Sequence, residues 1–225
     1  MKFGQWFVVG LVFLAGMALA DEPLVDIPYC GTLRVDGQDG DWSGRPGLVA
    51  LMVSKDGGIQ PPEDFDPQFR LGWNDDGLCF FLRVRDDARE TSQDATTPFE
   101  RDSIEIFVAK RRGAKEMYHA CLIPGAPGTV SPFRIRFYGP NTSAPARAYE
   151  VSAACAAGEG AGYTVEAVLP WRNLDLEPKA GDEIGVQVFV NDADNTPSRF
   201  QAVWYPRTRT HEDTTAMYRV RLGGP

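Results

Sequence analysis

Apolar and polar residues alternate along most of the chain, which is the period-two pattern of strands with one buried face. The alternation is clearest in five segments: Leu78–Arg85, Ser103–Val108, Pro132–Tyr138, Tyr163–Leu169 and Ile184–Val190. It is weaker in seven more: Leu33–Val35, Leu48–Val53, Phe69–Trp73, Met117–Ile123, Ala148–Ala154, Phe200–Trp204 and Tyr218–Leu222. This pattern predicts an antiparallel β-sandwich, jelly-roll-like, with about a dozen strands.

Turn residues separate the predicted strands. Asp75-Asp76-Gly77 predicts a tight hairpin before Leu78, because Asp-Gly tolerates the positive φ of such turns. Helical periodicity is nearly absent, and one short turn is expected at Trp171–Leu174. No linker composition divides the chain, so we expect a single domain over residues 21–225.

The first twenty residues have the layout of a cleaved secretory signal. Lys2 precedes the apolar run Phe7–Leu14, and the small residues of Ala18-Leu19-Ala20 precede the charged Asp21. The alternative is a membrane anchor, for which this run is short. We therefore expect cleavage after Ala20 and a secreted or periplasmic product. No later segment is apolar enough to span a membrane.

Composition limits the classes of partner that the chain is expected to bind. The chain has 23 Lys and Arg against 31 Asp and Glu, a formal net charge of -8. This balance argues against nucleic acid and against anionic membrane surfaces, which need a basic face. Four cysteines follow the signal: Cys30, Cys79, Cys121 and Cys155. They are either small core residues or form a disulfide in an oxidising compartment, with the pairing left open.

Five ordered stretches cover nearly the whole mature chain. They are Val35-Asp36-Gly37 with Asp41-Trp42, Gly72–Asp87 with its Asp-Asp-Gly turn, Arg101–Phe107, Gly162–Trp171, and Ile184–Asp194 with Asn191-Asp192. In this order they resemble carbohydrate-binding module family 9 and its DOMON-like relatives. The resemblance implies a β-sandwich that binds sugar at its rim. Trp42, Trp73, Trp171 and Trp204 adjoin turns or strand ends, where we expect them to pack in the core rather than on sugar.

The resemblance also implies where sugar would bind. Sugar-binding members hold a terminal sugar between two tryptophans. The matching positions here are Phe99, before the Arg-Asp-Ser-Ile-Glu-Ile-Phe stretch, and His211, in the last loop. A family glutamate matches Glu105, and a family glutamine is replaced by Phe189. Phe99, Glu105 and His211 are therefore the candidate pocket. The alternative for Glu105 is an exposed strand residue paired with an arginine such as Arg83.

Aspartates gather at predicted turns and strand ends. Ca²⁺ takes six to eight oxygen ligands, which loop carboxylates can supply, and the related modules carry structural calcium. The candidate ligands are Asp75, Asp76, Asp102, Asp192 and Asp194, with Asp86 and Asp87 nearby in sequence. The alternative is ordinary turn chemistry. The chain has only two histidines and no nucleophile motif, so we expect no catalysis.

Together these observations predict a non-catalytic carbohydrate-binding module of an exported protein. Only three residues follow the last predicted strand, so we expect no attached enzyme. One alternative is a haem-binding DOMON-like subunit of an exported redox enzyme, with ligands drawn from Lys115, Met117, His119 and Met217. The other is a ligand-free surface interaction module.

Overall fold

A computed structural model describes most of the chain after the predicted signal. The described residues are 23–42, 48–51, 53–54, 58, 60–91, 97–125, 134–138, 151–158, 160–174, 176–194, 200–207, 209–210 and 213–225. The signal peptide with its cleavage after Ala20 and the candidate residue His211 lie outside them. No helix in this part of the chain has the length and apolar character needed to cross a membrane.

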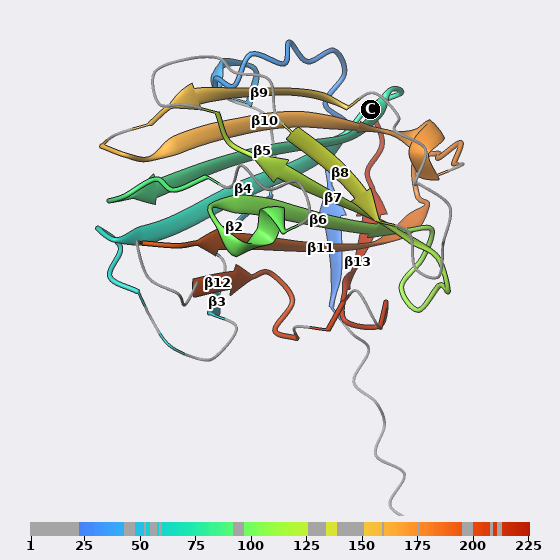
Figure 1. Cartoon of the computed structure of the whole chain (residues 1–225). Coiled ribbons are helices and arrows are strands. Elements are labelled where there is room, and N and C mark those ends of the chain that lie inside the picture. Colours follow the sequence, from blue (N-terminus) through green and yellow to red (C-terminus); the bar gives the residue numbers. More distant parts are fainter. Residues whose placement is uncertain are drawn as a thin grey trace, which may run out of the picture.

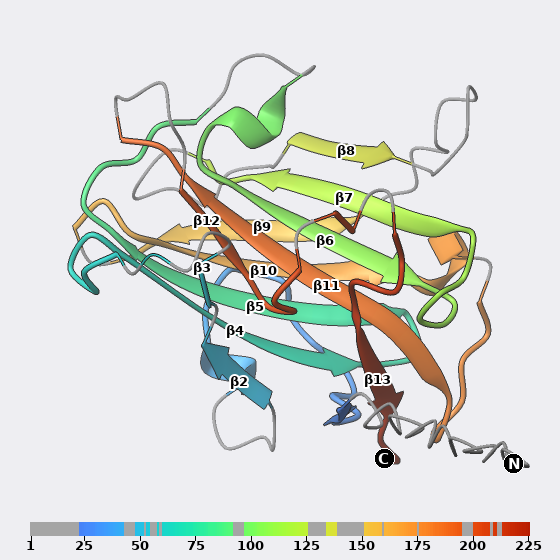
Figure 2. The same cartoon turned by 90° about the horizontal axis from the view of Figure 1, so that it is seen from below.

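Two β-sheets form the fold (Figures 1 and 2). The larger follows the order β1 (Leu24–Ile27), β13 (Tyr218–Leu222), β11 (Glu183–Asp192), β6 (Ser103–Ala109), β7 (Met117–Ile123) and β8 (Arg134–Tyr138). β12 (Phe200–Val203) pairs with β11, and β3 (Val53–Ser54) pairs with β12. The smaller follows the order β2 (Leu48–Leu51), β4 (Phe65–Trp73), β5 (Gly77–Asp86), β10 (Tyr163–Pro170) and β9 (Ser152–Ala157).

Three 3-10 turns complete the described elements: η1 (Gly40–Trp42), η2 (Pro98–Glu100) and η3 (Trp171–Leu174). All strand pairs within the two sheets are antiparallel except β1 with β13. The predicted all-β sandwich is confirmed, and so is the turn at Trp171–Leu174.

The main core lies between the sheets and follows from the alternation. In β6 the residues Ile104, Ile106 and Val108 face it, and in β5 so do Leu78 and Phe80, together with Leu82 and Val84 further along. Complete burial of such a side chain contributes about 1.5–3 kcal/mol. The four tryptophans expected to pack in the core are all buried, namely Trp42, Trp73, Trp171 and Trp204.

The outer face of the larger sheet is buried too. Every residue of β6 is buried, and so is every residue of β11 after Glu183. A second apolar cluster on this face consists of Phe107, Ala109, Met117, Phe189, Val203 and Met217. The expectation of strands with one exposed face is therefore wrong for the centre of this sheet.

The strand prediction needs correction in two places. Leu33–Val35 is not a strand, and its two apolar side chains pack on the outer face of the smaller sheet beside Trp42. Glu166 of β10 holds the residues that follow, because its carboxylate accepts the backbone N–H groups of Asp36 at 2.9 Å and Gly37 at 3.1 Å. The sequence pattern also missed β1, which is only four residues long.

The hairpin at Asp75-Asp76-Gly77 exists, but the expected reason for its glycine is wrong. Asn74 makes the turn, since its Oδ1 accepts the N–H groups of Asp76 and Gly77, each at 3.0 Å. The φ of Gly77 is not positive. Glycine is required there because a Cβ would lie 2.3 Å from the carbonyl oxygen of Leu169 on β10.

All four cysteines are buried thiols in the structure. Cys155 lies in the main core, whereas Cys30 and Cys79 share an outer cluster with Trp42. Cys121 stands opposite Glu105 in the β6–β7 ladder. The structure thus agrees with the expectation of small core residues.

The Glu166 carboxylate also accepts the indole N–H of Trp42 at 2.9 Å, so it fixes the whole segment before η1. We expect Glu166→Ala to lower the free energy of unfolding by about 1–3 kcal/mol, because three donors lose their acceptor. Urea unfolding of both proteins measures the difference. The control Asp26→Asn removes an exposed ion pair with Arg221 and should change stability much less. Equal losses in the two variants would contradict this role.

Candidate functional site

Five polar side chains meet on the buried outer face of the larger sheet. We call this set, from β6, β7, β11 and β12, the outer-face polar cluster: Ser103, Glu105, His119, Asn191 and Gln201. The strand register brings them together, because Asn191 pairs with Ser103 on one side and with Gln201 on the other. All five are buried, which requires that their polar atoms find partners.

Glu105 is the centre of this cluster, with only 5% of its surface exposed. Its Oε1 accepts the side-chain amide of Asn191 at 2.9 Å and that of Gln201 at 3.3 Å. Its Oε2 lies 2.8 Å from Nε2 of His119. The alternative of an exposed glutamate paired with Arg83 is wrong, since Arg83 lies on the other sheet and donates to Gln68.

The remaining amide contacts orient the cluster. Asn191 Nδ2 also lies 3.0 Å from the Ser103 hydroxyl oxygen, and Gln201 Nε2 donates to Asn191 Oδ1 at 2.6 Å. Each amide is therefore fixed by at least two partners. The cluster presents a carboxylate, two amides, a hydroxyl and an imidazole in one network, and such networks are rigid when fully satisfied.

Aromatic rings adjoin the polar cluster. The His119 ring stacks on Phe107 with centroids 4.0 Å apart and planes 17° apart. Phe189 stands where the resemblance implied a glutamine. Its ring centroid lies 4.8 Å from that of Phe107, and it belongs to the second apolar cluster. Gln201 of β12 instead brings an amide to Glu105. The sequence could not indicate this residue, because the pairing of β12 with β11 is known only from the structure.

Phe99 lies in η2, directly before β6, and is half-buried. Two contacts on its carboxyl-terminal side fix this segment. Arg101 forms an ion pair with Glu90 at 2.8 Å, and the backbone N–H of Asp102 donates to the Glu90 carbonyl at 2.8 Å. Phe99 thus lies just before β6, the strand that carries Glu105, while His211 lies outside the described residues.

Gln187 of β11 anchors both ends of the loop that contains position 211. Its Nε2 donates to the carbonyls of Tyr205 at 2.9 Å and Ala216 at 3.4 Å, and its Oε1 accepts the N–H of Tyr205 at 2.7 Å. Arg112 adds a second tie, since it donates to the carbonyl of Met217 at 2.9 Å. The flanks of the last loop are therefore fixed to the outer face of the larger sheet.

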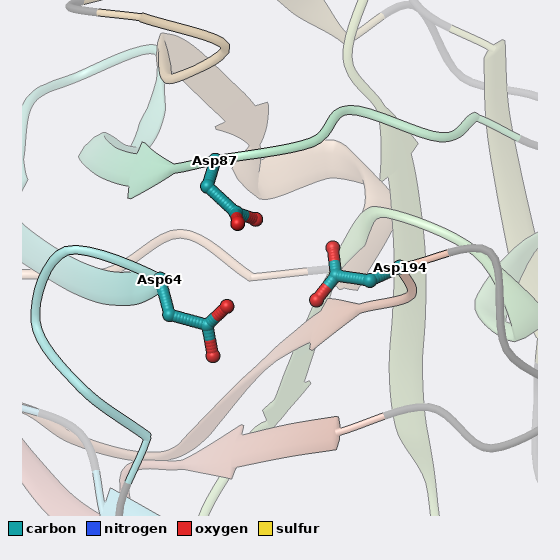
Figure 3. A group of neighbouring side chains, drawn as sticks. All are labelled: Asp64, Asp87 and Asp194. Carbon is teal, nitrogen blue, oxygen red and sulfur yellow. The ribbon is translucent and has the colours of Figure 1, made fainter.

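A second cluster, made of acidic residues, lies where β5 and β11 end (Figure 3). Carboxylate oxygens of Asp64, Asp87 and Asp194 lie within 4.8 Å of one another, and so do those of Asp86, Asp192 and Asp194. We call these five residues the carboxylate cluster. Asp86 comes from the smaller sheet and Asp192 from the larger, so the cluster spans both layers.

Burial and mutual repulsion raise the proton affinity of this region. Desolvation, followed by the charge of Asp194, raises the pKa of Asp192 to about 8. Desolvation also raises the pKa of Asp86 to about 6. The neighbouring Asp102 has a pKa raised to about 7 by desolvation and by the charge of Asp86. Each shift says that the negative form of the group is poorly compensated by the protein itself.

Unpartnered buried oxygens indicate that these carboxylates could hold a cation. Asp192 is 2% exposed, and its Oδ1 and that of Asp194 are buried without a hydrogen-bond donor. The fully buried Tyr163 hydroxyl is also unpartnered, and its burial, followed by the charges of Asp102 and Asp86, raises its pKa. Hard carboxylate oxygens in this number suit Ca²⁺, whose charge would compensate them. The residues present therefore fit the calcium ion that the resemblance implied.

The structure divides the candidate calcium ligands. It brings Asp192 and Asp194 together. It places Asp102 close enough to Asp86 and Asp194 for their negative charges to repel that of Asp102. Asp75 and Asp76 are exposed at the other end of the ten-residue β5, roughly 30 Å away at strand spacing.

Asp64 is not among the calcium ligands expected from the sequence. Its backbone carbonyl accepts the N–H of Asp87 at 3.2 Å, so β-pairing outside the strands brings it to the cluster. Only its place immediately before the apolar–polar alternation of β4 could have indicated it.

Comparison with known proteins assigns the family. The sequence matches the profile of the carbohydrate family 9 binding domain-like family over residues 35–224. The chain belongs to this family. This family 9 domain is 24% identical over 198 residues to an endo-1,4-beta-xylanase A of Thermotoga neapolitana, covering 85% of the chain. It spans only 17% of that enzyme's length.

Solved structures of the same family share the fold. A family 9 carbohydrate-binding module of Caldicellulosiruptor kristjanssonii, in complex with cellotriose, superposes with a TM-score of 0.68 at 19% identity. The match covers 90% of this chain and 95% of that one. A structure of a module from the same organism in complex with glucose gives a TM-score of 0.67 at 18% identity, over 90% and 97% of the two chains.

The raised pKa values predict how the stability of this family 9 domain depends on pH without divalent cations. Between pH of about 4 and 8 the folded state binds more protons than the unfolded state, because Asp86, Asp102 and Asp192 titrate near 6, 7 and 8. The free energy of unfolding should therefore fall as the pH rises through this window. Urea unfolding in a chelator at several pH values tests this, and a rise in stability over this window would contradict it.

Ca²⁺ should stabilise the domain most at the alkaline end of that window, where the carboxylates are ionised and repel. At a hundredfold excess over the dissociation constant, stabilisation is about 2.7 kcal/mol, or roughly 5–10 °C in Tm. Thermal unfolding at pH 8 with Ca²⁺ or chelator measures this. Asp192→Asn should abolish the response, whereas Asp75→Asn should leave it unchanged. Equal Tm values with Ca²⁺ and with chelator would contradict the site.

Proposed function

We propose that this family 9 domain binds carbohydrate without catalysis and takes a terminal sugar at the outer-face polar cluster. Glu105 would accept a hydrogen bond from a sugar hydroxyl, and Phe99 and the loop residue His211 would form the side walls. The observation that carries the proposal is the buried Glu105 carboxylate held by Asn191, Gln201 and His119.

The chemistry of the cluster matches a sugar. Each hydroxyl of a pyranose is both a donor and an acceptor, so a sugar needs acceptors and donors at short spacing. Glu105 supplies an acceptor-only carboxylate, whereas Asn191 and Gln201 offer both amide oxygens and amide N–H groups. The His119 ring stacks on Phe107, which orients the imidazole beside the Glu105 carboxylate.

The relatives suggest which sugars to try first. The Caldicellulosiruptor modules are in complex with cellotriose and glucose, and the Thermotoga relative is an endo-1,4-beta-xylanase. We infer that the ligand is a β-1,4-linked glucan or xylan fragment. Export to the periplasm or the cell exterior, where such polymers occur, is supported by the signal-like residues 1–20.

The haem alternative receives no support from the site. Met117 and Met217 are buried in the second apolar cluster, and His119 contacts Glu105 and Phe107. These side chains contribute to packing and to the polar network. A ligand-free interaction module would leave the network of Glu105 without a purpose beyond stability.

Isothermal titration calorimetry with glucose, xylose, cellobiose, cellotriose and xylotriose tests the proposal. We expect measurable binding to at least one sugar by the wild type in Ca²⁺. Glu105→Gln keeps the shape but loses the charge-assisted hydrogen bond, and should weaken binding roughly tenfold to a hundredfold. The variant should retain most of its Tm, because the glutamine oxygen still accepts the amide of Asn191.

The matched control is Glu183→Gln at the exposed start of β11, where the carboxylate pairs with Arg219. It removes one negative charge from the same sheet and should leave the sugar affinity unchanged. Absence of heat for every sugar at millimolar concentration, or equal affinities in wild type and Glu105→Gln, would overturn the proposed function.

A further inference from the structure

The carboxylate cluster and the outer-face polar cluster lie on opposite faces of the same strand ends. Asn191 and Asp192 are consecutive residues at the end of β11, and Asp102 and Ser103 are consecutive where β6 begins. Because strand side chains alternate, Asn191 and Ser103 point to the outer face while Asp192 and Asp102 point toward Asp86. The two clusters therefore share two stretches of backbone.

Asp102 ties these stretches to each other. Its Oδ1 accepts the backbone N–H of Ala193 at 3.0 Å, and its Oδ2 accepts the backbone N–H of Glu90. Asp102 is itself fully buried, so its position and that of its neighbours are linked rigidly. Movement of the end of β11 must therefore move the start of β6, which carries Ser103 and Glu105.

The segment with Phe99 is tied to the same place. Glu90 follows Asp86 and Asp87 after the end of β5, and it holds Arg101 and Asp102 through an ion pair and backbone hydrogen bonds. Three chain segments thus converge on the carboxylate cluster: the end of β5, the end of β11 and the segment 97–102. Without a cation, their like charges repel one another in a poorly solvated region.

We propose that divalent cation binding at the carboxylate cluster sets the carbohydrate affinity of the outer-face site, by fixing Phe99 and Glu105 through Asp102. This inference rests on the proposed function for its sugar-binding readout. Two sites that share one ordered element raise each other's affinity by the same factor, because coupling free energy is reciprocal. Ordering these segments in advance also removes an entropic cost from sugar binding.

Hydrogen exchange of the full chain, with no sugar present, tests the ordering step independently of the proposed function. With Ca²⁺ in place of chelator, amides of residues 98–105 and 189–193 should exchange at least several-fold more slowly. The β4–β5 hairpin at residues 73–78 is the internal control for global stabilisation and should change much less. Equal effects at the hairpin and at residues 98–105, or no effect at either, would overturn the proposal.

Calorimetry then tests the coupling. Sugar affinity should fall at least tenfold when Ca²⁺ is replaced by chelator, and the Ca²⁺ affinity should rise by the same factor in saturating sugar. Asp192→Asn should give the weak, chelator-like sugar affinity whether or not Ca²⁺ is present. The matched control Asp76→Asn, at the distant hairpin, should keep both affinities and their coupling.

The outcomes separate the two proposals. Ca²⁺ binding with an unchanged sugar affinity would overturn the coupling and leave the proposed function standing. Slower exchange at residues 98–105 in Ca²⁺, without any sugar binding, would overturn the proposed function while supporting the ordering of these segments.

Discussion

The central strands β6 and β11 are buried on both faces, and this constraint shapes the rest of the structure. One face of each strand is aliphatic and packs against the smaller sheet, as Ile104, Ile106 and Val190 do. The other face carries buried polar residues, whose polar atoms need hydrogen-bond partners. Asn191 and Gln201 donate to the Glu105 carboxylate, and Nε2 of His119 lies 2.8 Å from it.

The same constraint acts differently where the strands end. On the core side, Val190 gives way to Asp192, and the aliphatic filling of the sandwich stops at carboxylates rather than at solvent. Here the protein supplies too few donors, as the bare Oδ1 of Asp192 shows. One sheet thus carries a hydrogen-bonded polar network on its outer face and unpartnered carboxylate oxygens where β11 ends.

Local alternation was sufficient to predict the sandwich and most of its strands, because a strand's period is visible in the sequence. It could not show that Ser103–Ala109 is covered on both sides, since burial of the polar face depends on distant loops such as the one that Gln187 holds. The positions of Glu105 and Phe99 within the family motifs identified them as candidate sugar-site residues. The partners of Glu105 stayed hidden, because Gln201 and His119 reach it only through strand pairing.

The thiol of Cys121 stands opposite Glu105 and is fully buried. A cysteine so placed is a built-in reporter, since alkylating reagents reach it only when the strands around the polar network part. Its labelling rate would report the rate of local opening of that face in the native chain, without an engineered probe or a bound ligand.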